Sequence, residues 1–374
     1  MARKKKLVNR VISAVMALVM VLAYMPMPAP LSVSAAEGES TNEASVTLVG
    51  AEGQQSETRE CATLAEAVTA ANTNEGSIIT LLKDVSTAEC IEITGKDITL
   101  ELNGKTLTGS HSWSVLKVDS TGSLTIKSSL EGGKIATANS ELAIDNEGAL
   151  VIENGAIENT TPENGVSRSG IASNGMLTIY GGDISATTDG VYVANGKVTI
   201  NGGDIRGGVC SIEVNPCAQG QSAELIVNDG KLIGTSSGIR AIAYSGDVAI
   251  TVNDGYISGG DYAIEDISGA NTTINGGTLN GENVVYDEEG DTGAVTLGEG
   301  VVLYDENYDV VRLSDATGTV YALKEVPEEA EKISVTVGAN VTKHVTLAEA
   351  VKVANVNEGS IITLLKDVST AERI

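Results

Sequence analysis

The most regular feature of the chain is a three-residue pattern in which an apolar, a variable and a second apolar residue follow one another. Side chains alternate between the two faces of a strand, so each triplet predicts a short strand whose first and third residues face a core. Successive triplets are 21 to 27 residues apart. The pattern occurs at Leu100–Leu102, Leu124–Ile126, Leu150–Ile152, Leu177–Ile179, Val198–Ile200, Leu225–Val227, Ile250–Val252 and, imperfectly, Thr272–Ile274.

Another aliphatic residue stands five positions after the triplet in each of the last six copies, and a glycine precedes it by two positions. Glycine, Asn and Asp accept a positive φ at low energetic cost, so we expect the chain to turn a corner at the same place in every copy. The glycines are Gly155, Gly182, Gly203, Gly230, Gly255 and Gly277, and the aliphatic residues are Ile157, Ile184, Ile205, Leu232, Ile257 and Leu279.

Strand, corner and second strand can be arranged as a sandwich of hairpins or as a stack of parallel coils. Hairpin turns differ in length and type from one to the next. Here the corner is constant and only the spacing elsewhere varies, by up to six residues, which is typical of stacked coils with loop excursions on one side. The sequence therefore predicts an all-β fold, a parallel β-helix solenoid.

A longer repeat encloses these copies. Residues 63–91 recur at 346–374 with four differences in 29 positions. Each copy opens with a capping box, Thr63 and Glu66 in the first, and with apolar residues on one helical face, which predicts a capping helix at 63–72. Such a helix would cover the open end of the stacked sheets.

These patterns divide the chain into six parts. We expect a secretory signal peptide (1–36), a lead-in strand and loop (37–60), the β-helix unit with its capping helix (61–285), closing strands (286–325), an acidic linker (326–333) and the start of a second, truncated unit (334–374). The signal peptide follows from the basic cluster between Arg3 and Arg10, the apolar run Val11–Met25 and the small residues before Ala36. It predicts a secreted or cell-wall-associated protein with no membrane insertion after cleavage.

The composition supports a thin repetitive fold and restricts the partners. The chain has 42 Gly, no Phe and one Trp, so large side chains to fill a thick interior are few. Removing the first 36 residues, which hold five Lys and Arg and no acid, leaves a formal charge of 19 − 50 = −31. Nucleic acid and anionic membranes are therefore excluded as partners, because like charges repel.

The copies at Gly175–Ile184 and Gly196–Ile205, together with the helix and strand that precede them, resemble right-handed parallel β-helix proteins of the pectate-lyase-like superfamily. More closely, they resemble the β-helix repeat regions of secreted Gram-positive surface proteins. The resemblance covers roughly residues 60–285 and implies a fold more firmly than a function, because this scaffold carries lyases, glycosidases, adhesins and inert stalks alike.

The hydrolase motifs of that superfamily, with paired Asp, Gly-His-Gly and Arg-x-Lys, are absent, since the only histidines are His111 and His344. The nearest approach to a lyase site is Asp183 and Asp204, which occupy the same outward position of adjacent coils and could bind Ca²⁺. Their position holds ordinary surface residues in the other coils. No other cofactor is expected.

Glycan binding would require exposed aromatic side chains. Tyr180, Tyr192, Tyr244 and Tyr256 are predicted to point outward, although they form no single column. The asparagines at the corners are better explained as a stack of amides that stabilises the turns; they are Asn103, Asn201, Asn228, Asn253 and Asn275.

Four cysteines in an exported chain favour disulfides. Neither Cys61 nor Cys90 is retained in the second copy, and this paired loss predicts a bond between them. Cys210 and Cys217 lie seven residues apart in one segment and are predicted to pair likewise.

Three functional classes are compatible with these observations. The first is a surface protein that acts as an adhesin or scaffold and binds polysaccharide or a host or microbial surface protein. The second is a polysaccharide lyase or glycoside hydrolase, and the third is a passive stalk. The first is preferred, because no cluster of catalytic residues is evident in the sequence.

Overall fold

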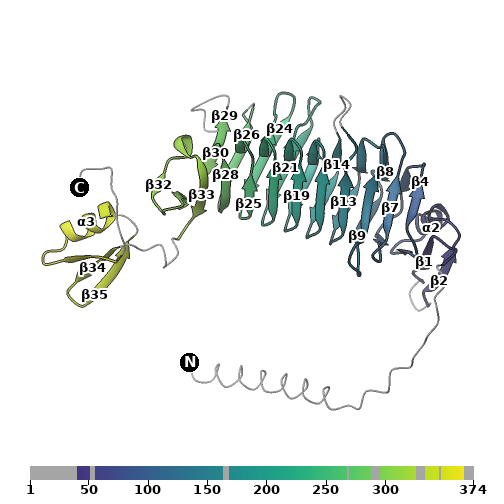
Figure 1. The fold of residues 1–374 in the computed structure, drawn as a ribbon, viewed down its shortest axis with the longest axis horizontal. Helices are drawn as coiled ribbons and strands as arrows, with labels where there is room; N and C mark the ends of the chain where they lie inside the picture. The colour runs from purple at the N-terminus through teal and green to yellow at the C-terminus, as the bar shows by residue number, and fades with distance from the viewer. Residues whose placement is uncertain are drawn as a thin grey trace, which may run out of the picture. The chain divides into compact units, whose positions relative to one another are not determined.

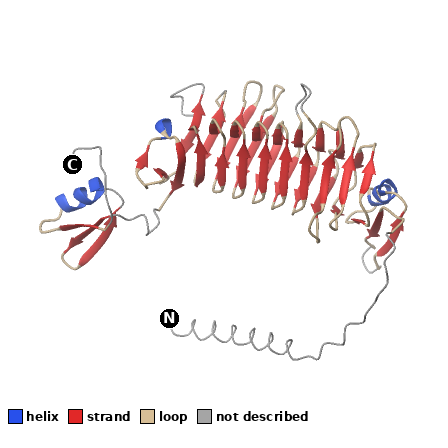
Figure 2. Ribbon diagram, viewed as in Figure 1, coloured by secondary structure: helices blue, strands red, loops and turns tan. Residues whose placement is uncertain are grey.

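The computed structural model describes residues 40–50, 55–162, 168–267, 269–287, 295–325, 333–344 and 347–365. Within these ranges, strands of three sheets follow one another along the chain and wind into a solenoid (Figures 1 and 2). All neighbouring strands between β3 and β30 pair in parallel across successive turns. The predicted all-β parallel solenoid is confirmed.

The first sheet contains the strands predicted from the apolar triplets. Its order is β2-β1-β3-β6-β9-β12-β15-β18-β21-β24-β27-β30. The bounds are β1 Ala44–Leu48, β2 Glu57–Cys61, β3 Ile78–Leu81, β6 Ile98–Glu101, β9 Ser123–Lys127, β12 Ala149–Ile152, β15 Met176–Ile179, β18 Gly196–Ile200, β21 Ser222–Val227, β24 Asp247–Val252, β27 Asn271–Ile274 and β30 Val295–Leu297.

The second sheet follows the glycine corners. Its order is β32-β31-β33-β28-β25-β22-β19-β16-β13-β10-β7-β4. The bounds are β4 Val85–Thr87, β7 Thr106–Gly109, β10 Lys134–Thr137, β13 Ala156–Asn159, β16 Asp183–Ala186, β19 Asp204–Gly207, β22 Lys231–Gly234, β25 Tyr256–Ser258, β28 Gly277–Gly281, β31 Val302–Asp305, β32 Val310–Val311 and β33 Gly318–Leu323.

A third sheet of nine strands, not predicted from the sequence, completes each turn. Its order is β29-β26-β23-β20-β17-β14-β11-β8-β5. The bounds are β5 Ile91–Ile93, β8 Ser114–Val118, β11 Leu142–Asn146, β14 Ser169–Ser173, β17 Asp189–Val193, β20 Cys210–Val214, β23 Ser237–Ala241, β26 Tyr262–Asp266 and β29 Asn283–Asp287.

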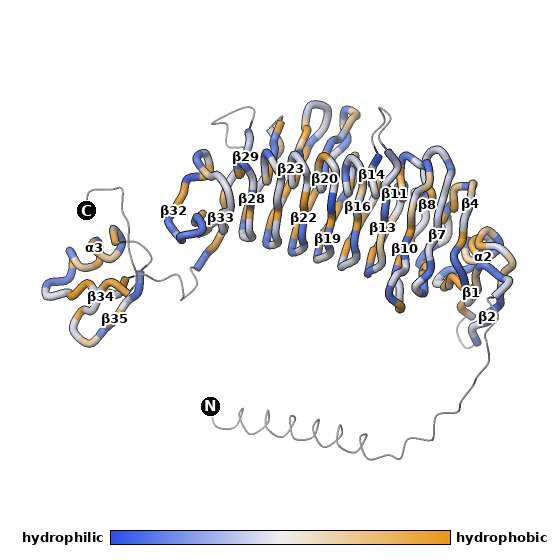
Figure 3. The backbone as a smooth tube through the Cα atoms, viewed as in Figure 1, coloured by the Kyte–Doolittle hydropathy of each residue, from blue (hydrophilic) through white to orange (hydrophobic). Residues whose placement is uncertain are grey.

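The hydrophobic core lies inside the turns. Hydrophobic and hydrophilic positions alternate along the strands (Figure 3), and the inward aliphatic residues stack on their equivalents in the next turn. Ile157, Ile184 and Ile205, for example, are paired in register and almost completely buried. One triplet was predicted in the wrong register: β6 places Ile98 and Leu100 opposite Leu124 and Ile126. Both assignments alternate with period two, so the pattern alone could not distinguish them.

The corners superimpose as predicted. All six corner glycines adopt a positive φ, between 93° at Gly182 and 123° at Gly230. Four corner asparagines form a ladder in which each Nδ2 donates to Oδ1 of the Asn in the preceding turn: Asn228 to Asn201 (2.8 Å), Asn253 to Asn228 (2.8 Å) and Asn275 to Asn253 (2.9 Å). Asn103 does not belong to this ladder, because its Nδ2 donates to the carbonyl oxygen of Leu81.

The ladder gives a first testable expectation. Asn228→Ala removes a donor and an acceptor at once, and we expect it to lower the free energy of unfolding by about 1 kcal/mol, the net contribution of hydrogen bonds of this kind. Denaturant unfolding measures the change. Asn271→Ala, at an exposed position of β27 outside the ladder, is the control. Equal effects of the two variants would show that the ladder contributes nothing.

Antiparallel strands end the parallel stack on both sides. β1 pairs antiparallel with β2 and β3, and α2 (Leu64–Ala71) packs its buried face into the same core. Thr63 caps α2, since its Oγ1 accepts a hydrogen bond from the Glu66 amide (3.2 Å). On the other side β33 pairs antiparallel with β28 and β31, and the short 3-10 helix η1 (Leu313–Asp315) precedes it.

The second copy of the long repeat builds the same local structure. Its elements are β34 Ile333–Val337, β35 Asn340–His344, α3 Leu347–Asn355 and β36 Ile361–Leu364. β34 pairs antiparallel with β35 and β36, as β1 does with β2 and β3, and the residues form their own hydrophobic cluster. The predicted signal peptide (1–36) and all but the last residue of the linker (326–333) lie outside the described residues.

Candidate functional site

The four tyrosines predicted to contact glycans do not come together. Tyr192 lies on β17 of the third sheet and Tyr256 on β25 of the second. Tyr180 follows β15 at a corner, and Tyr244 lies in the loop after β23. Tyr180 and Tyr244 are well exposed, whereas Tyr192 and Tyr256 are partly buried. They do not form a common sugar-binding platform.

The two aspartates predicted to bind calcium are in register on β16 and β19. Asp183 is exposed, and Oδ2 of Asp204 lies 2.5 Å from Nη2 of Arg206. Ca²⁺ takes six to eight oxygen ligands. Two carboxylates on an open strand surface, one already paired with a guanidinium group, provide few of them.

All four cysteines are free thiols, so neither predicted disulfide is formed. Sγ of Cys90 lies 3.3 Å from Oγ of Ser114, and Sγ of Cys217 lies 2.9 Å from Oη of Tyr192. Cys210 begins β20 and Cys217 follows its end. Five extended residues rise about 13 Å, which is more than the Cα separation of about 6 Å that a disulfide needs.

The structure instead places a column of charged and aromatic side chains on the third sheet. One outward residue of each strand is in register with its neighbours, and most of these residues are charged or aromatic. In order they are Glu92, Lys117, Asp145, Ala172, Tyr192, Glu213, Arg240, Glu265 and Tyr286.

A groove of about 470 Å³ lies over the middle of this column. The charged residues that line it, among those the structure describes, are all acidic, and we call it the acidic groove. Its lining includes Trp113, Glu141, Asp145, Asn174, Asp189, Tyr192, Glu213 and Asn215. Lys117 and Arg240 flank it in the column. Lys117 pairs with Glu147 outside the groove (3.1 Å), and Arg240 pairs with Glu265 (3.4 Å) and, at 3.8 Å, with Glu213 of the groove.

Two aromatic rings of the acidic groove are held by hydrogen bonds. Nε1 of Trp113, the only tryptophan, donates to Oδ2 of Asp145 (2.8 Å), and half of its side chain is exposed. Oη of Tyr192 donates to the carbonyl oxygen of Asn215 (3.2 Å). Burial raises the pKa of Asp145, and the hydrogen bond from Trp113 opposes this effect. Fixed aromatic rings next to hydrogen-bonding groups are typical of sites that bind sugars.

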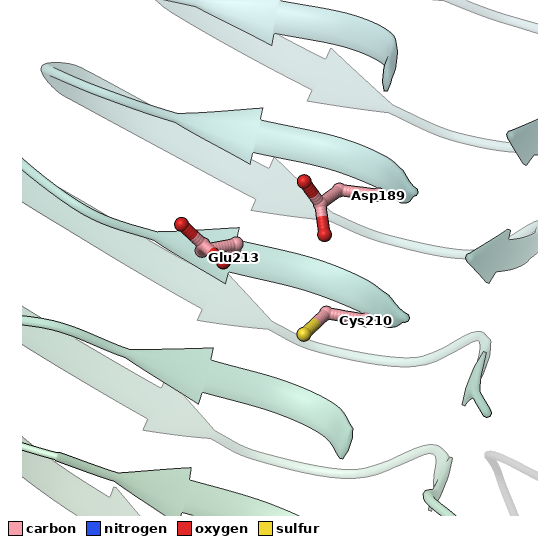
Figure 4. A group of neighbouring side chains, drawn as sticks. All are labelled: Asp189, Cys210 and Glu213. Atoms are coloured by element: carbon pink, nitrogen blue, oxygen red, sulfur yellow. The ribbon is translucent and has the colours of Figure 1, made fainter. Parts of the chain in front are cut away.

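Asp189 lies at the bottom of the acidic groove and is only 3% exposed. Burial, and then the charge of Glu213, raises its pKa to about 7. Its Oδ1 has no hydrogen-bond partner. Figure 4 shows Asp189 on one strand and Cys210 and Glu213 on the next, with their side chains gathered together. Burial and the two neighbouring carboxylates also raise the pKa of the Cys210 thiol.

No known family matches the chain, and neither a curated protein nor a solved structure matches it. Within the described ranges no helix is long and apolar enough to cross a membrane. The fold and this groove are therefore the basis for any functional conclusion.

Of these residues, only Tyr192 and Cys210 were predicted from the sequence, and neither was predicted in this environment. Trp113, Asp145, Asp189 and Glu213 follow one another at intervals of 24 to 44 residues and meet only through the stacking of turns. Their one signal in the sequence was the single tryptophan, placed directly before an apolar alternating segment.

Proposed function

We propose that this protein is a secreted or wall-associated surface protein that binds glycans in the acidic groove. The observation that carries the proposal is the pairing of two hydrogen-bonded aromatic rings, Trp113 and Tyr192, with carboxylates in one groove. Aromatic faces stack on sugar rings, and carboxylate oxygens accept hydrogen bonds from sugar hydroxyl groups. The resemblance to repeat regions of Gram-positive surface proteins and the signal peptide predicted at residues 1–36 support the same role.

The charge of the groove limits the glycans that fit. Four acids line it, and the chain without its signal peptide is strongly negative. Anionic polysaccharides such as polyuronates would be repelled. Neutral glycans and glycans that carry free amino groups are therefore the preferred ligands, and nucleic acid and anionic membranes are excluded for the same reason.

A glycan array tests the proposal, followed by calorimetry with the retained glycan. We expect Trp113→Ala to weaken binding about tenfold, because stacking on an aromatic ring contributes about 1.4 kcal/mol. Tyr180→Ala, which removes an exposed aromatic ring outside the groove, is the matched control and should bind as the wild type does. Retention of no glycan, or equal loss in both variants, would contradict the proposal.

The second candidate is a glycoside hydrolase or polysaccharide lyase. It is favoured by the proximity of Asp189 and Glu213, whose nearest carboxylate oxygens lie within 4.8 Å, since pairs of carboxyl groups catalyse glycoside hydrolysis. Assays for reducing ends and for unsaturated products distinguish it from a binder. Release of product by the wild type that is lost in Glu213→Gln would favour the enzyme. A passive stalk would neither bind nor cleave.

A further inference from the structure

The side chains of Asp189, Cys210 and Glu213 form a cluster that the proposed function does not require. One carboxylate oxygen of each acid and Sγ of Cys210 all lie within 4.8 Å of one another (Figure 4). Asp189 and Cys210 begin β17 and β20 and are paired in register, and Glu213 lies three residues further along β20. Two adjacent turns of the solenoid thus supply three potential ligands.

A local departure from strict alternation turns these side chains to one side. A Cβ at Gly190 would meet Cγ2 of Ile205 in the core, and Oγ of Ser211 donates inward to the carbonyl oxygen of Ile205 (2.9 Å). In both strands the first three residues are buried and the fourth is partly exposed. The ligand atoms of the first and fourth residues nevertheless lie within 4.8 Å of one another, so these side chains lie on the same side of the sheet. Asp189 and Cys210 therefore share a surface with Glu213.

The three side chains of the cluster include two carboxyl groups and no cation, although Asp189 and Cys210 are buried. Asp189 is 3% exposed and Cys210 is fully buried, and Oδ1 of Asp189 has no hydrogen-bond partner. The nearest cationic group, Nη1 of Arg240, lies 3.8 Å from Oε2 of Glu213 and is shared with Glu265. The carboxylate of Asp189 accepts hydrogen bonds from the backbone amide of Cys210 and the hydroxyl group of Ser169, and only its Oδ1 is left without a partner. A buried carboxylate with an unsatisfied oxygen is destabilising unless it is neutralised or coordinates a metal ion.

We propose that Asp189, Cys210 and Glu213 bind one divalent metal ion of borderline softness, with Zn²⁺ as the best match. A thiolate with two carboxylates suits Zn²⁺, whereas Ca²⁺ and Mg²⁺ prefer oxygen ligands alone. Asn215 supports the arrangement, since its Nδ2 donates to Oε1 of Glu213 (3.0 Å). Asp189 and Glu213 also line the acidic groove, so a further coordination position would open toward it. This inference does not rest on glycan binding.

The test uses the full chain, stripped of metal with a chelator, and the metal alone as the probe. Calorimetry with Zn²⁺ should show a single tight site per chain. Titration with Co²⁺ should produce the ultraviolet charge-transfer band of a cobalt–thiolate bond. Cys210→Ser should abolish this band, and Asp189→Asn should weaken Zn²⁺ binding about tenfold or more.

Cys217→Ser is the matched control, because it removes an exposed thiol outside the cluster. It should leave the cobalt band and the Zn²⁺ affinity unchanged. Cys210→Ser should fold, since Ser237 occupies the paired position of the next turn, and circular dichroism checks this. Absence of a tight Zn²⁺ site in the wild type, or a cobalt band that persists without Cys210, would overturn the proposal.

Discussion

Replacing Gly175 with alanine is expected to lower the free energy of unfolding by about 3 kcal/mol or more. Gly175 precedes β15, where successive turns approach closely: a Cβ there would lie 2.1 Å from the carbonyl oxygen of Gly148. The same oxygen accepts the hydrogen bond from the Met176 amide (2.8 Å). The added methyl group can be accommodated only if two turns separate, which would weaken their pairing.

Denaturant unfolding of Gly175→Ala measures this effect. Gly220→Ala is the control: its Cβ would have no atom within 4 Å, and its positive φ of 84° accounts for a loss of only about 1–2 kcal/mol. If Gly175→Ala were no more destabilised than Gly220→Ala, the close approach of the turns would be refuted. The same contact recurs at Gly148 and Gly196, so each of these positions is expected to exclude alanine.

The second large effect is expected at Asp189. In the metal-free protein, Asp189→Ser should raise the free energy of unfolding by about 3 kcal/mol above pH 7. The pKa of Asp189 rises from an ordinary value of 3.8 to about 7, mainly through burial. This difference corresponds to roughly 4 kcal/mol before allowance for partial screening. Serine fits the position, because Ser237 lies two turns away in the same column.

The pH dependence gives the sign of this effect. The folded state holds the Asp189 proton more tightly than the unfolded state. The contribution of Asp189 to stability is therefore most favourable below pH 3.8 and is lost as the pH rises to about 7. The gain in the free energy of unfolding that Asp189→Ser gives over the wild type should therefore vanish below about pH 4 and reach its full size above pH 7. Unfolding curves across this range, with a chelator present, test it. Asp183→Ser, at an exposed position of β16, the strand directly before β17, is the control; an equal gain in stability there would contradict the explanation.

The sequence predicted two of the three sheets, and the reason is physical. Strands of the first two sheets are joined by a corner of constant length, so their glycines and aliphatic residues keep a fixed spacing. Strands of the third sheet are flanked by loops of variable length, as between β20 and β21, where Asn215 to Gln221 intervene. Their two consecutive buried positions, such as Gly190 and Val191, also break the alternation that reveals a strand.

The candidate site could not be predicted for the same reason. The short spacing in the sequence predicted that Cys210 pairs with Cys217. In the structure the extended strand separates these two residues and brings Cys210 next to Asp189 of the preceding turn. Asp183 and Asp204, which were predicted to occupy the same position of adjacent turns, do lie side by side. Which residues of adjacent turns become neighbours depends on the loop lengths within each turn. These lengths can be read from the sequence only when all the strands of the turn are known.

The antiparallel strands that end the stack have a mechanical consequence. In the described part of the chain, β34, β35 and β36 share no backbone hydrogen bonds with the solenoid strands and pack around a core of their own. Under tension applied along the chain, each such unit would then resist force separately, and the unfolding of one unit would not unfold the next. A protein that carries several such units would extend in discrete steps under force, one step for each unit that unfolds.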